Sequence, residues 1–76
     1  MKTVEEILEK VLKVNAKTIS DSTKPEDIES WDSFNGLVLV TELEKNFNVE
    51  FSLNEVVSVK KVGDIKNILR GHGLKI

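Results

Sequence analysis

The chain contains no cysteine, and this absence excludes several kinds of chemistry at once. Without thiols there is no disulfide bond, no thiolate metal site and no cysteine nucleophile. Histidine occurs only as His72, between two glycines, so a Ser-His-Asp arrangement would need a frayed tail to fold back over the rest of the chain. We therefore expect a protein that is not an enzyme.

Long apolar runs are also absent. The first segment, MKTVEEILEKVLK, is charged throughout, and no stretch approaches the roughly 20 apolar residues that cross a bilayer. Asp27, Glu29 and Asp32 lack the glycine turn of a calcium-binding loop, so no metal site is expected. We expect a cytoplasmic protein that does not associate with membranes.

Neither sign of charge dominates, because 13 acidic and 11 basic residues leave a net charge of only −2. It is unevenly distributed: residues 14–32 hold five acids and two lysines, whereas residues 60–76 hold five basic residues and one acid. A basic segment of this size is more typical of a solvated helix face and a loose end than of nucleic-acid binding. Nucleic acid is therefore not an expected partner.

What the chain does contain is helical signal. Its 76 residues fit one domain, residues 1–76, with a modest core. Thr3 and Glu6 match a capping box, and the apolar residues that follow recur at the spacing of one helix face, which predicts a helix over about 3–13. Residues 14–32 hold the single proline and many turn-forming residues, so they predict a long loop with a short helical turn near residues 25–28.

Three further helices are expected. A long one covers 33–47 and stops near Asn48, a short one over about 53–57 begins with the Ser52 and Glu55 capping box, and the last begins at Val62. Gly71 is expected to terminate the last helix. The sequence thus predicts an all-α fold: a small four-helix bundle, with three main helices, one short helix and a long first loop.

The helix over 33–47 has more apolar residues than one buried face requires. At about 100° per residue they separate into a core stripe and an opposite stripe. The expected core residues are Gly36, Leu39, Val40, Leu43 and Phe47. Phe34, Leu37 and Val38 are expected to form an exposed patch, which indicates a protein contact surface unless the long loop covers it.

Three residues at the head of this helix each allow two interpretations. Gly36 costs the helix about 1 kcal/mol relative to alanine, a cost that is either tolerated or reflects the close approach of a ligand or backbone. Asp32 and Ser33 suit a helix cap. A phosphodiester on the Ser33 hydroxyl would suit the same positive helix end.

Together these features resemble an acyl carrier protein. The resemblance covers essentially the whole chain and rests on an Asp-Ser-Phe motif, the long helix behind it and two later segments. The matching residues are Asp32, Ser33, Phe34, Leu37, Val40, Leu43, Glu44 and Phe47, then Val49-Glu50-Phe51 and Val62-Gly63-Asp64-Ile65.

The resemblance implies a carrier whose Ser33 receives 4'-phosphopantetheine from coenzyme A through a phosphopantetheinyl transferase, with Asp32 helping that enzyme to dock. The monomeric carrier would hold acyl groups as thioesters and present them to acyl-loading and acyl-transferring enzymes. The residues expected to contact these partners are Phe34, Leu37, Val38, Thr41, Glu42 and Glu44.

Departures from the family pattern narrow the expected pathway. Val38 replaces a glutamate of the family's helix, and Lys45 and Asn46 stand where fatty-acid-synthesis carriers often have acids. We therefore expect a specialised biosynthetic pathway rather than housekeeping fatty acid synthesis. Two alternatives stay open: an aminoacyl or peptidyl carrier, and a helical protein-interaction module without a prosthetic group.

Overall fold

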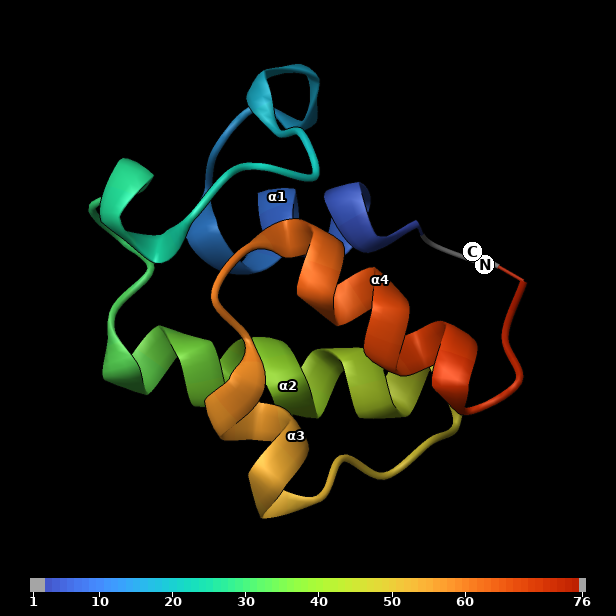
Figure 1. Cartoon of the computed structure of the whole chain (residues 1–76). Coiled ribbons are helices and arrows are strands. Elements are labelled where there is room, and N and C mark those ends of the chain that lie inside the picture. Colours follow the sequence, from blue (N-terminus) through green and yellow to red (C-terminus); the bar gives the residue numbers. More distant parts are fainter. Residues whose placement is uncertain (1–2, 76) are drawn as a thin grey trace.

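The first helix, α1 (Val4–Leu12; Figure 1), begins at the predicted capping box. The computed structural model describes residues 3–75. The Thr3 hydroxyl accepts a hydrogen bond from the Glu6 amide at 3.2 Å, and the Glu6 carboxylate accepts one from the Thr3 amide at 3.0 Å. The helix stops at Lys13, which adopts the left-handed backbone conformation with φ 59°. The ends of the predicted segment 3–13 are thus the caps of this helix.

Three more α-helices follow within residues 3–75. They are α2 (Ser33–Phe47), α3 (Leu53–Ser58) and α4 (Val62–Gly71), with short 3-10 turns at Ala16–Thr18 and Pro25–Asp27. Asn48 ends α2 in the left-handed conformation, and Ser52 with Glu55 forms the predicted capping box of α3. The all-α prediction is confirmed. No helix in this part of the chain is long and apolar enough to span a membrane.

The prediction that Gly71 terminates α4 is wrong. Gly71 is still helical, and Gly73 is the residue with a left-handed backbone, at φ +93°. The Leu74 amide donates to the Leu69 carbonyl at 3.2 Å and the Gly73 amide to the Arg70 carbonyl at 2.9 Å. This pair of bonds is a Schellman motif, which places its glycine one position beyond the cap.

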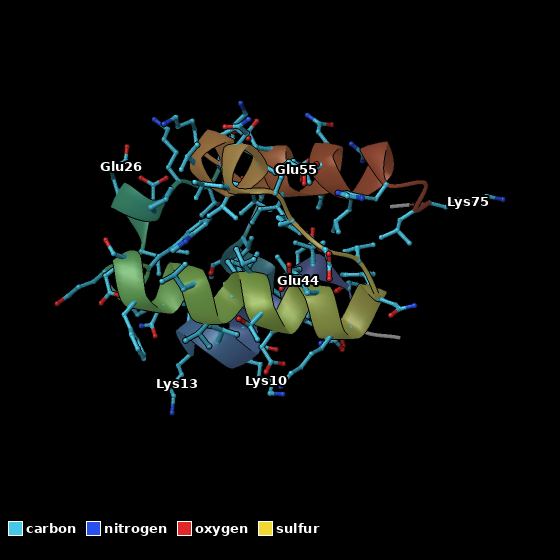
Figure 2. All side chains as sticks on the ribbon, turned by 90° about the horizontal axis from the view of Figure 1, so that it is seen from below. Lys10, Lys13, Glu26, Glu44, Glu55 and Lys75 are labelled. Atoms are coloured by element: carbon cyan, nitrogen blue, oxygen red, sulfur yellow. The ribbon has the colours of Figure 1, made fainter. Side chains whose placement is uncertain are left out.

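The hydrophobic core lies between α1, α2 and α4, and Figure 2 shows α2 and α4 on opposite sides of a layer of side chains. The buried residues are Val4, Ile7, Leu8, Leu12, Trp31, Leu39, Leu43, Phe47, Val62, Ile65 and Leu69. Helix α3 contributes no buried residue. Its position therefore depends on contacts outside the core.

The long loop between α1 and α2 is tied to the start of α4. The Val62 amide donates to the Thr23 carbonyl at 2.9 Å, and the Gly63 amide donates to the Asp21 carbonyl at 2.8 Å. A Cβ at position 63 would lie 3.1 Å from that Asp21 oxygen, which is tighter than an ordinary contact. Glycine at this position thus lets the two backbones approach.

Candidate functional site

Ser33 is the first residue of α2, and it does not cap the helix. The cap is Asp32, whose carboxylate accepts a hydrogen bond from the Asn35 amide at 2.9 Å. The Ser33 side chain is exposed, and its hydroxyl has no hydrogen-bond partner within residues 3–75. Of the two interpretations of this helix start, the cap therefore applies to Asp32, and the Ser33 hydroxyl is free for another role.

The segment before Ser33 is fixed by two hydrogen bonds of Ser30. The Ser30 hydroxyl donates to the Leu12 carbonyl at 2.7 Å, and the Ser30 carbonyl accepts from the Asn35 side chain at 2.7 Å. The next residue, Trp31, is inserted into the core with 8% of its surface exposed. These contacts hold the loop against the end of α1 and set the position at which α2 begins.

The amino-terminal end of α2 offers donors to an anion. The amides of Ser33 and Phe34 have no acceptor within the described part of the chain. Unpaired amides and the helix dipole make such an end favourable for a phosphate group. A phosphodiester on Ser33 therefore fits the residues present.

A cavity of about 140 Å³ lies beside Ser33, bounded by α2, α3, α4, the connections that flank α3, and the long loop through Pro25 and Trp31. Its lining is mainly apolar and includes Gly36, Val40, Phe51 and Val56. A Cβ at Gly36 would lie 3.8 Å from Trp31 Nε1, an ordinary contact, so no neighbouring backbone requires the glycine. Its missing side chain instead enlarges the cavity.

Three of the residues expected to contact partners share one exposed side of α2. Phe34 is 73% exposed and Leu37 is 61% exposed, and Thr41 is exposed one helical turn further on. We call these three residues the α2 surface. The long loop does not cover it, because the tryptophan of that loop is inserted in the core instead.

The other three residues of that group lie elsewhere on α2. Val38, expected to face solvent, is half-buried, and it shares the face of Glu42, whose carboxylate lies 3.3 Å from Lys10 of α1. Glu44 accepts a hydrogen bond from the Phe51 amide at 2.8 Å. The two glutamates therefore contact different neighbours, Glu42 the ammonium of Lys10 and Glu44 the amide of Phe51.

One cluster beside the cavity has no signal in the sequence. His72 Nε2 lies 3.0 Å from the Glu55 carboxylate, and the His72 ring stacks on Phe51 with 6.2 Å between centroids and 20° between planes. The pKa of Glu55 is lowered, first by the backbone amide of Ser52 and then by His72. The expectation of a frayed tail at His72 is therefore wrong, because these contacts hold it on α3.

The described residues contain no group of three or more histidine, cysteine, aspartate or glutamate side chains that could hold a metal ion.

Comparison with known proteins gives one clear result. The model of the family described as "Phosphopantetheine attachment site" matches residues 2–69, which include the whole of α2 and the cavity beside Ser33. No curated protein matches the chain.

Proposed function

Because the chain belongs to the phosphopantetheine attachment family, and is thus a non-catalytic carrier with covalent 4'-phosphopantetheine, we propose that Ser33 is its attachment residue. Its partners include a phosphopantetheinyl transferase and the enzymes that load the carrier. When bound, the prosthetic group supplies a thiol for thioester chemistry, which the cysteine-free chain lacks.

The observation that carries this assignment is a comparison of all the serine hydroxyls. The other five serines are hydrogen-bonded: Ser20 to Ser22, Ser30 to the Leu12 carbonyl, Ser52 to the Glu55 amide and Ser58 to the Glu55 carbonyl. Within residues 3–75 the Ser33 hydroxyl alone has no partner, and it stands at the positive end of a long helix. A transferase can therefore reach it without breaking a bond of the fold.

We propose acyl groups as the cargo. Support comes from the cavity beside Ser33, whose lining is mainly apolar and contains no charged side chain. An apolar chain gains from leaving water there, whereas an ammonium group would lose its hydration without an acidic partner. This favours an acyl cargo over an aminoacyl one.

The α2 surface supports a specialised pathway. Glu42 and Glu44 are engaged within the molecule, so the side of α2 next to Ser33 presents Phe34, Leu37 and Thr41 rather than acids. Electrostatic steering toward basic enzymes would be weak, and partner choice would depend on apolar contact. We propose that Asp32 assists docking of the transferase and that the carrier acts as a monomer.

The attachment site is tested by intact-mass measurement after incubation with coenzyme A and a broad-specificity phosphopantetheinyl transferase. We expect a gain of one phosphopantetheinyl group, its loss in Ser33→Ala and its retention in Ser58→Ala. An unmodified wild-type chain, or a gain that persists in Ser33→Ala, would contradict the assignment. The mass of the cargo on protein isolated from its own host then separates acyl from aminoacyl groups.

The α2 surface is tested by placing a charge on it. Phe34→Glu should slow acyl transfer by the cognate enzymes, because it puts a carboxylate where an apolar contact is proposed, and Phe34, unlike Leu37, does not line the cavity. Leu53→Glu is the matched control, since Leu53 is an exposed leucine on α3, with 77% of its surface accessible. Equal losses in both variants would argue against a surface centred on α2.

A further inference from the structure

We infer that Phe51 limits the cavity to short acyl chains, and that Glu44 and His72 hold it in position to do so. This inference rests on the proposed function and names the class of cargo. It is argued from the size of the cavity, the place of Phe51 in its wall and the contacts that fix the phenyl ring.

The cavity volume sets the scale of the cargo. The space beside Ser33 measures about 140 Å³. Apolar protein cavities of about 150 Å³ take up benzene, so the space here matches a group of about six carbons. A longer chain would have to leave its remaining carbons in water or displace part of the wall.

Phe51 enters the cavity wall from the connection that follows the carboxyl-terminal end of α2, whereas Ser33 stands at the other end of that helix. The Phe51 amide donates to the carboxylate of Glu44, which follows Ser33 by eleven positions in α2 and so lies about 16 Å further along the helix axis. Phe51 also lines the cavity while remaining half-buried. Truncating its ring would therefore enlarge the cavity without removing a fully buried core residue such as Leu43 or Ile65.

The Phe51 ring is held from a second direction. His72 stacks on it, and the His72 imidazole is in turn held by Glu55 at 3.0 and 3.2 Å from the two carboxylate oxygens. Helix α3, which starts two residues after Phe51, has no buried residue of its own. The cluster thus replaces core packing as the contact that keeps this wall of the cavity in place.

The test uses the transferase and coenzyme A analogues to load Ser33 with acyl-phosphopantetheine groups in which an amide replaces the thioester. The acyl chains run from acetyl to dodecanoyl, each product is confirmed by intact mass, and its Tm is measured. Each carbon that enters the cavity leaves water and stabilises the fold, so Tm should rise with chain length up to about hexanoyl and then level off. In Phe51→Ala, and to a smaller extent in Phe51→Leu, the rise should continue to octanoyl or decanoyl. Leu53→Ala, which changes an exposed neighbour, should keep the wild-type limit.

His72 is tested as a positioning residue in the same series. In His72→Ala the rise in Tm should no longer stop sharply near hexanoyl. In His72→Phe it should stop there again, because an aromatic ring can still stack on Phe51. A general loss of stability would lower every Tm without moving the chain length at which the rise stops. Restoration of the limit by phenylalanine therefore separates positioning from stability.

The outcomes that overturn the inference are distinct from failure of the proposed function. A correctly loaded series whose Tm does not depend on chain length, or rises without a break to dodecanoyl, overturns the inference and leaves the attachment site intact. An unchanged limit in both Phe51 variants does the same. Failure to load Ser33 at all overturns the proposed function and the inference with it.

Discussion

The ammonium group of Lys66 in α4 lies 2.6 Å from the carboxylate of Asp21 in the long loop. The same ammonium lies 2.5 Å from the carboxylate of Glu5 in α1, and only 14% of the Lys66 side chain is exposed. Hydrogen bonds to Asp21 and Glu5 raise the pKa of Lys66, and Lys66 lowers the pKa of Asp21. One lysine therefore joins three segments that are distant in sequence.

The stability of the protein should fall on both sides of neutral pH. Lys66 has a raised pKa in the folded state, so its contribution is complete below its ordinary value and is lost as the pH rises through the raised one. Asp21, Glu55 and Asp64 have lowered pKa values, so their contributions are present above the ordinary carboxylate values and are lost as the pH falls below about 4.

Urea midpoints measured across pH test this prediction. Lys66→Met should reduce the loss of stability that begins above about pH 10. It should also reduce the loss of stability at acidic pH, because Asp21 loses its partner. Lys17→Met is the control, since Lys17 is exposed and lies in the first 3-10 turn. An alkaline fall of equal size in Lys66→Met and wild type would contradict this role for Lys66.

Phe47→Ala should cost about 3 to 5 kcal/mol in the free energy of unfolding, because Phe47 is 6% exposed and its removal leaves a cavity in the core. Phe34→Ala is the matched change on the same helix, and at 73% exposure it should alter the free energy by no more than about 0.5 kcal/mol. Denaturant titration measures both. Similar costs for the two phenylalanines would show that Phe34 is covered in solution.

Gly36→Ala should stabilise the unloaded protein by up to about 1 kcal/mol, since alanine is the better helix former and its Cβ would meet Trp31 Nε1 at an ordinary 3.8 Å. The same methyl group would narrow the cavity, so hexanoyl loading should raise the Tm less than in wild type. Thermal melts of unloaded and loaded protein give both quantities. Destabilisation of the unloaded form would contradict the open space at this position.

Asp32 should have two roles that two substitutions separate. Asp32→Ala removes the side chain that accepts the Asn35 amide, and should cost about 1 kcal/mol. Asp32→Ser keeps a cap and should largely restore stability. If the carboxylate also helps the transferase to dock, both variants should be modified slowly. A serine variant that is stable and is modified at the wild-type rate would leave the cap as the only role of Asp32.

The helices could be predicted because their signals are local. Capping boxes at Thr3 and Ser52 and the apolar spacing of α2 depend on residues within a few positions of one another. The motif at Asp32 and Ser33 was likewise readable from the sequence. The sequence did not show which of the two residues caps the helix, because both side chains suit the position and only the backbone places Asp32 there.

The errors arose where a residue's surroundings come from a distant segment. Gly71 and Gly73 both flank His72, and only the bonds that Gly73 and Leu74 donate back to α4 decide which one ends the helix. Val38 is half-buried although it lies outside the core stripe, because α1 packs beside that face of α2. The contact of His72 with Phe51 joins residues too far apart for any periodicity to reveal.

Asp32 caps the helix and Ser33 is the proposed attachment residue, and this separation of roles affects how such a chain can evolve. The helix start depends on Asp32, so replacing Ser33 removes no hydrogen bond of the fold. A duplicated copy that lost this serine would stay folded and would still display the α2 surface. With the α2 surface as the proposed contact for partner enzymes, such a copy would occupy those enzymes without delivering a cargo to them.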